Sequence, residues 1–153
     1  MLFCFANAEL LKGNVSEAYI PKGFYGSWGV ISKLDSSNNP AIFNKESRDI
    51  WTLSGYNNIL ILENLQNGAR SEIEIKEKSK KDNLKFDRKR IVEKDNEKII
   101  YKEMVEFKLY GNSFSGVDKF IVETYEKNVL KEKSEAKYII QGVKISGEKP
   151  KLN

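Results

Sequence analysis

Apolar and charged residues alternate over most of the last two-thirds of the chain, and short turn sequences interrupt the alternation. The turn sequences are Asn67-Gly68, Asp95-Asn96 and Gly111-Asn112. Strict alternation is typical of a β-strand with one buried face, and two-residue turns of this composition connect antiparallel neighbours. The pattern therefore predicts eight strands, over residues 24–34, 49–54, 59–64, 69–76, 84–92, 99–110, 114–125 and 130–145.

The turns also predict which residues face each other across neighbouring strands. In a two-residue hairpin the numbers of paired residues add to a constant, and side chains alternate between the two faces. Applied at each turn, the rule pairs Leu62 with Ile73, Trp51 with Leu62, Ile75 with Phe86, Phe86 with Val105, and Leu109 with Phe114. These residues share one apolar face, whereas the other face is charged. A two-residue turn at Lys127-Asn128 would break this separation, so we expect a bulge or a longer turn in the last hairpin.

A sheet that is apolar on one face must be covered or must close on itself. No long helix is predicted: Ser16 caps one helical turn over residues 17–20, which Pro21 and Gly23 end. We therefore expect an all-β, eight-stranded antiparallel up-and-down (meander) barrel. It would span residues 23–147, after an N-terminal segment over 9–22 and before a tail over 148–153, with a long polar loop over 35–48.

Residues 1–8 form an apolar, uncharged segment that ends in Ala6-Asn7-Ala8. Small residues in this spacing are typical of a signal-peptidase site, although the basic region and the longer apolar run of a complete signal peptide are missing. Two interpretations stay open. The chain begins partway through a signal peptide, so that the mature, extracytoplasmic protein starts at Glu9, or an ordinary hydrophobic N-terminus covers one end of the barrel. Cys4, the only cysteine, lies in this segment.

Composition narrows the range of functions. The chain has no histidine, which removes the commonest general base and the commonest metal ligand. We therefore expect a non-enzymatic protein without a metal or cofactor. An enzyme that uses only carboxylates ranks third, after the two non-enzymatic functions given at the end of this section. The net charge of +4 comes from 22 Lys against 4 Arg, and the Lys residues are interleaved with Glu. Nucleic-acid binding is not expected from this pattern, and no stretch approaches the roughly 20 apolar residues of a transmembrane helix.

Several polar residues fall on the inward face of the predicted barrel. Arg88 should lie opposite Glu103, Arg90 opposite Tyr101, and Asp118 opposite Val105. One interpretation is a polar patch in a ligand cavity, where Arg88 or Arg90 receives an anionic head group. The other is an interior salt bridge that satisfies itself, or a bulge that turns the arginines outward. The inward aromatic residues either line a pocket or simply fill the core: they are Trp51, Phe86, Phe107, Phe114 and Phe120.

Gly26-Ser27-Trp28, on the first predicted strand, resembles the Gly-x-Trp signature of the lipocalins and the wider calycin group of eight-stranded barrels. The resemblance implies that Trp28 packs at the closed end of the barrel, next to Gly26, and that the interior binds a small hydrophobic or amphipathic molecule. The sequence departs from the family at the turn Gly111-Asn112, where a Thr-Asp-Tyr motif is absent. It also lacks the arginine that covers the tryptophan, for which only Lys144, Lys149 or Lys151 could substitute.

With this layout and these departures, the chain resembles a divergent, bacterial type of lipocalin-like barrel. The leading expectation is an extracytoplasmic, periplasmic or secreted, barrel that binds a small apolar or amphipathic ligand. The alternative is a filled barrel that acts as a structural or protein-interaction module of the cell envelope.

Overall fold

The computed structural model describes residues 18–146, which form a single antiparallel sheet of eight strands. The strands are β1 (Gly26–Ser37), β2 (Glu46–Tyr56), β3 (Ile59–Asn64), β4 (Arg70–Glu74), β5 (Asn83–Lys94), β6 (Glu97–Tyr110), β7 (Ser113–Glu126) and β8 (Val129–Ser146). Two short 3₁₀ turns, η1 (Lys22–Phe24) and η2 (Pro40–Ile42), complete the described elements. The strand order is β4-β3-β2-β1-β8-β7-β6-β5, so each strand neighbours the next in sequence except at β4 and β5, which are the two edges, and β1 also pairs with β8.

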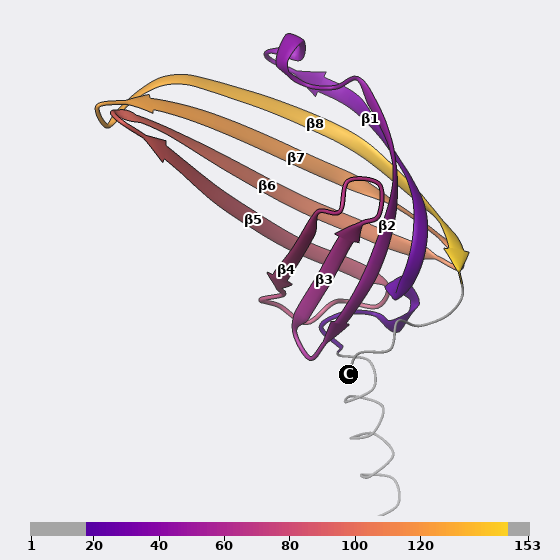
Figure 1. The fold of residues 1–153 in the computed structure, drawn as a ribbon. Coiled ribbons are helices and arrows are strands. Elements are labelled where there is room, and N and C mark those ends of the chain that lie inside the picture. The colour runs from indigo at the N-terminus through magenta and orange to yellow at the C-terminus, as the bar shows by residue number, and fades with distance from the viewer. Residues whose placement is uncertain (1–17, 147–153) are drawn as a thin grey trace, which may run out of the picture.

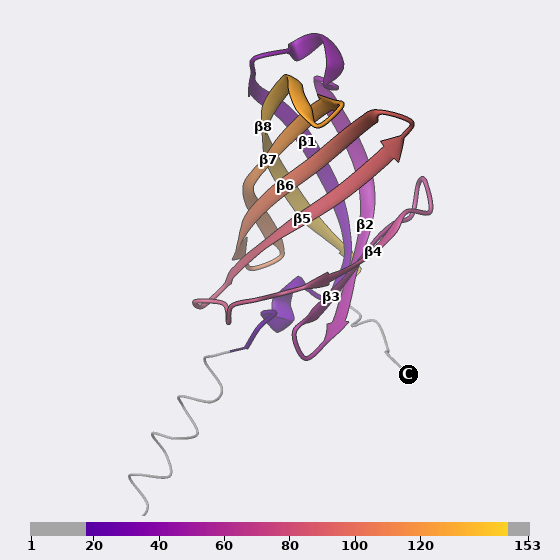
Figure 2. The ribbon, with the colours of Figure 1, turned by 90° about the vertical axis from the view of Figure 1, so that its left-hand side faces the viewer.

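The sheet curls into a nearly closed barrel, as the two ribbon views show (Figures 1 and 2). This confirms the predicted all-β meander, and the architecture is compatible with a lipocalin-like fold. The long hairpins β5–β6 and β7–β8 extend well past the short strands β3 and β4 (Figure 1). The barrel stays open at one seam, because no backbone ladder joins β4 to β5.

The open seam corrects the predicted hairpin between these strands, in which Ile75 would pair with Phe86. Strand β4 ends at Glu74, and the chain that follows is bonded elsewhere. The Ile75 amide donates to the Asn58 carbonyl at 2.7 Å, and Ser79 donates through its amide and its hydroxyl to the Ala18 carbonyl. The connection is therefore held against the β2–β3 turn and the N-terminal segment rather than in a ladder with β5.

The register of the long hairpins is as predicted. Phe86 pairs with Val105, Arg88 with Glu103, and Leu109 with Phe114. The predicted bulge in the last hairpin is present between Thr124 and Tyr125. The bulge changes which face of β8 points inward, so that Ala136, Tyr138 and Ile140 are buried, whereas Lys133 and Glu135 are exposed.

The register of the two short hairpins was predicted wrongly, by two residues in each case. Leu62 pairs with Leu53 on β2 and with Ser71 on β4, instead of with Trp51 and Ile73. The β2–β3 turn is Asn57-Asn58 because asparagine tolerates the positive φ of 51° there, whereas the bulky Tyr56 does not favour it. Residues 65–69 form a longer loop than the two-residue turn expected. A shift of two keeps every side chain on its face, so the apolar interior survives both errors.

One end of the barrel is closed by a packed aromatic cluster around Trp28. The indole is fully buried, its Nε1 donates to the Phe24 carbonyl at 2.8 Å, and its ring meets Phe114 edge-on at 4.8 Å. Lys144 lies over the indole with its Nζ 5.1 Å from the ring centroid, and it donates to the Gly23 carbonyl. A lysine therefore covers the tryptophan where the resemblance implies an arginine; Lys149 and Lys151 lie outside the described residues.

The residues that lead into this end form a 3₁₀ turn at Lys22–Phe24, not the helical turn predicted over 17–20. Pro21 precedes the turn, and its fixed φ suits entry into a helical conformation better than exit from one. Of the predicted turn, Ser16 and Glu17 lie outside the described residues, and Ala18 to Ile20 are not helical.

Candidate functional site

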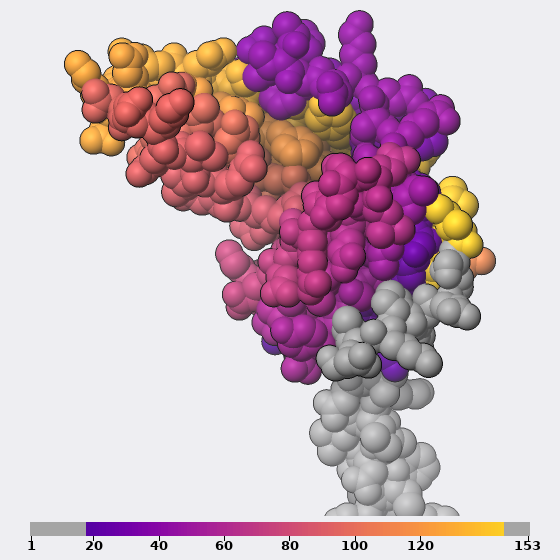
Figure 3. All heavy atoms as spheres, viewed as in Figure 1, coloured from indigo at the N-terminus to yellow at the C-terminus, as the bar shows by residue number. Residues whose placement is uncertain are grey.

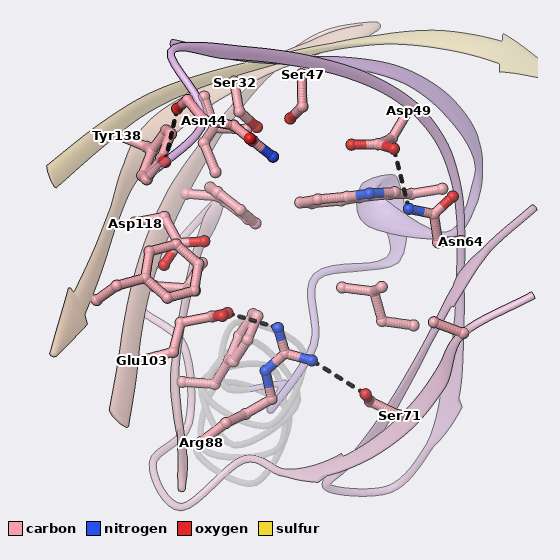
Figure 4. Close-up of a pocket in the computed structure, with 18 of the residues that line it drawn as sticks. Ser32, Asn44, Ser47, Asp49, Asn64, Ser71, Arg88, Glu103, Asp118 and Tyr138 are labelled. Carbon is pink, nitrogen blue, oxygen red and sulfur yellow. Dashed lines mark hydrogen bonds and ion pairs between the residues drawn. The ribbon is translucent and has the colours of Figure 1, made fainter. Parts of the chain in front are cut away.

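The barrel contains a cavity of ≈ 410 Å³ between the aromatic cluster and the opposite, open end. Its wall is built from inward-facing positions of all the strands and from the loop after η2 (Figure 4). In the space-filling view, the surface is hollowed between this loop and strands β3 and β4, and atoms of the colour of β7 are visible at the back (Figure 3). The cavity is therefore open to solvent on one side.

Aromatic side chains form the apolar part of the wall. Phe107 lies deepest and is 1% exposed, and it contacts Trp51 and Phe86 at centroid distances of 6.1 and 6.3 Å. Phe120 packs edge-on against Tyr138 at 5.6 Å. The two interpretations of these residues are compatible, because the same rings that fill the core on one side line the cavity on the other.

Arg88 and Glu103 form an ion pair across β5 and β6, as their predicted register requires. The Arg88 Nη2 lies 2.6 Å from the Glu103 Oε1, and the Arg88 Nη1 donates to the Ser71 hydroxyl at 3.0 Å. The side chains are 35% and 12% exposed, so the pair lies at the edge of the cavity rather than at its centre (Figure 4). Since Ser71 is on β4, this hydrogen bond also crosses the open seam that no backbone ladder closes.

Arg90 and Tyr101 do not line this cavity. The guanidinium of Arg90 lies over the Tyr101 ring, 4.6 Å from its centroid, and Arg90 is exposed. Both residues line a neighbouring hollow of ≈ 620 Å³ along the seam, which shares Ser71, Arg88 and Glu103 with the cavity. The structure thus brings together Trp51, Phe86, Arg88, Glu103, Phe107 and Phe120 of the predicted ligand-binding residues, and places the other two beside them.

Asp118 is the most buried charged residue of the cavity wall. It lies on β7 between Val105 of β6 and Tyr138 of β8, and is 5% exposed. Its Oδ1 is buried without a hydrogen-bond partner. Burial, and to a lesser extent the negative charge of Glu103, raise the pKa of Asp118 to about 8, although Arg88 acts in the opposite direction. At neutral pH the carboxyl is therefore mainly protonated.

The open end of the cavity carries polar groups that the sequence did not single out. The Asn64 amide donates to the Asp49 carboxylate at 3.1 Å, and the Tyr138 hydroxyl donates to the Asn44 carbonyl at 2.7 Å (Figure 4). Burial raises the pKa of Tyr138, and nearby Asp118 adds to the effect. Tyr138 could have been found only from the exact position of the bulge in the last hairpin. The position of Asn64 beside Asp49 could be predicted only from the correct β2–β3 register, in which Asn64 pairs with Trp51.

The chain matches no protein-family model, no curated protein and no solved structure. Fold and site therefore define a class only: an eight-stranded antiparallel meander barrel, nearly closed, with a cavity in its interior. Within residues 18–146, no three His, Cys, Asp or Glu side chains are grouped as a metal site would require. No helix in this part of the chain has the length and apolar character needed to cross a membrane.

Proposed function

We propose that this protein is a non-enzymatic barrel that binds a small apolar or amphipathic molecule in its interior. The observation that carries the proposal is the cavity of ≈ 410 Å³, which has apolar rings on one side and a few convergent polar groups on the other. Its volume is within the roughly 300–1,000 Å³ typical of small-molecule sites, and this mixture of groups is typical of them too. A filled barrel, the structural alternative, would occupy the same space with its own side chains.

On this proposal the rings of Trp51, Phe86, Phe107 and Phe120 contact the apolar part of the ligand. A relation to the lipocalins is supported by the buried Trp28 of the Gly-x-Trp sequence and by Lys144 above its ring. An extracytoplasmic location is supported by Ala6-Asn7-Ala8, which lies outside the described residues.

The first test is native mass spectrometry of protein isolated from its own host. A co-purified small molecule, released on unfolding, would support the proposal and identify the ligand. The second test needs no knowledge of that ligand. N-phenyl-1-naphthylamine, an uncharged apolar dye, should bind saturably with one site per chain and gain fluorescence.

A matched pair of variants assigns dye binding to the cavity. Ser32 is buried in the cavity wall, so that Ser32→Leu adds volume inside. Ser115 pairs with Lys108 and Gln141 on the outer face, so that Ser115→Leu makes the same change outside. We expect Ser32→Leu to weaken dye binding at least about tenfold and Ser115→Leu to leave it unchanged. Absence of saturable binding, or equal binding by both variants, would contradict the proposal.

A further inference from the structure

The balance of charge in the cavity wall departs from the sequence-based expectation of an anionic head group on arginine. Among the residues of 18–146 that line the cavity, Arg88 is the single basic side chain, against the carboxyl groups of Asp49, Glu103 and Asp118. The guanidinium of Arg88 is already engaged by Glu103 and Ser71. An incoming carboxylate would therefore have to displace an ion pair and would meet further acidic groups.

Asp118 is the group whose hydrogen-bonding capacity is left unused. Asp49 has Asn64 as a partner and Glu103 has Arg88, whereas the Asp118 Oδ1 is buried and has none. A buried acceptor without a partner costs free energy, and such groups in native proteins are usually completed by a ligand, an ion or water. Asp118 lines the cavity, and Figure 4 shows its carboxyl group on the same side of the cavity as Glu103 and Tyr138.

We propose that the ligand is an amphipathic amine, whose apolar body lies against Trp51 and Phe107 and whose cationic head group binds Asp118. The proposal rests on the proposed ligand-binding function and specifies the chemical class of the ligand. Arg88 does not oppose the cation strongly, because Glu103 neutralises it at 2.6 Å. The aromatic rings add to the attraction, since the face of an indole or phenol favours a nearby cation.

The protonation of Asp118 gives this mode of binding a pH signature. The groups that face Asp118 are Glu103 of β6, Arg88 of β5 and Tyr138 of β8. Burial and, to a lesser extent, Glu103 raise the pKa of Asp118 to about 8 against the opposing effect of Arg88, whereas an alkylamine stays protonated as lysine does, with a pKa of about 10. Forming the ammonium–carboxylate pair below pH 8 therefore releases one proton from Asp118. The dissociation constant of the amine should therefore decrease as pH rises from 6 to 8, by up to about tenfold per pH unit.

Three probes that share one chain length but differ in the charge of the head group separate the contribution of that charge from that of the apolar chain. They are decylammonium, decanoate and 1-decanol. Isothermal titration calorimetry at pH 6, 7 and 8, in two buffers of different ionisation enthalpy, gives the affinity and the number of protons released. We expect decylammonium to bind at least about tenfold more tightly than decanoate at pH 7, with a proton released on binding. Asp118→Asn should remove both this preference and the proton release, while 1-decanol binds as before.

Asp87→Asn is the matched control. Asp87 lies on β5 in an exposed ion pair with Lys76, so that the same substitution there should change none of these values. Tighter binding of decanoate, or equal binding of all three probes by the wild type, would overturn the amine proposal while leaving a ligand-binding barrel. Failure of all three probes to bind would overturn the ligand-binding function itself.

Discussion

The buried carboxyl of Asp118 makes the stability of the barrel depend on pH in an unusual direction. Its pKa is raised from 3.8 to about 8 by burial in the folded protein. Between these values the folded state holds a proton that the unfolded chain has released, so the free energy of unfolding decreases as pH rises. The contribution is fully present below pH 4 and is lost as pH rises through about 8.

The magnitude follows from the width of this window. Each pH unit between the two pKa values contributes 1.36 kcal/mol, so that the three units from pH 5 to pH 8 give an upper limit of about 4 kcal/mol. Water that enters the open cavity reduces the cost of the ionised form, so we expect a loss of about 2–4 kcal/mol. The chain has no histidine, so no imidazole titrates between pH 5 and pH 8.

The assay compares the wild type with Asp118→Asn by urea unfolding, followed by the fluorescence of Trp28 and Trp51, at pH 5, 6, 7 and 8. Asparagine resembles the protonated carboxyl in shape and cannot ionise. At pH 5 the two proteins should therefore be nearly equal in stability, and at pH 8 the variant should be the more stable by about 2–4 kcal/mol. Groups common to both proteins cancel in the difference. A difference that stays constant from pH 5 to pH 8 would refute the buried, protonated state of Asp118.

Glu103→Gln should cost about 1–3 kcal/mol, less than for a fully buried pair because the Arg88 side chain is 35% exposed. In urea unfolding of Arg88→Met, Glu103→Gln and the double variant, additive losses would show that the two side chains do not interact. Gly142→Ala should cost about 1–3 kcal/mol in the same assay, because a Cβ there overlaps the buried Phe114 ring. Gly29→Ala, whose Cβ would meet Ile145 at an ordinary 3.5 Å, is its control, and equal losses would contradict the argument. Lys144→Met should lower the thermal unfolding temperature, with a loss of about 1 kcal/mol from the contact over Trp28 and the bond to Gly23; an unchanged temperature would leave the contact without energetic weight. Protein isolated from its own host should begin at Glu9 on N-terminal sequencing, and recovery of an intact Met1 would end the export hypothesis.

The sequence by itself was sufficient for the long hairpins. Asp95-Asn96 and Gly111-Asn112 are tight turns whose geometry is local, so each one determines the register of the strands on both sides of it. Arg88 opposite Glu103 follows directly from the first of these turns. The bulge in the last hairpin was also predictable, because without it charged residues of β8 would have faced the apolar interior.

The tertiary structure decided what depends on residues distant in the chain. The seam between β4 and β5 stays open because Ile75 and Ser79 bond to Asn58 and Ala18, and no local pattern distinguishes those partners from a hairpin. The loop over 65–69 replaces a two-residue turn for the same reason, since Leu65 donates to the carbonyl of Ile50 on β2.

The candidate site combines both kinds of information. Alternation placed Asp118 on the inward face, but its burial depends on strands β6 and β8 together with the aromatic rings beside it. A raised pKa and an unused hydrogen-bonding atom are properties of that packed surrounding, which the sequence pattern does not contain. Whether the interior is filled or hollow likewise depends on how rings from several strands meet. A pattern of faces specifies which side chains point inward, and only their packing in three dimensions specifies how much space they leave.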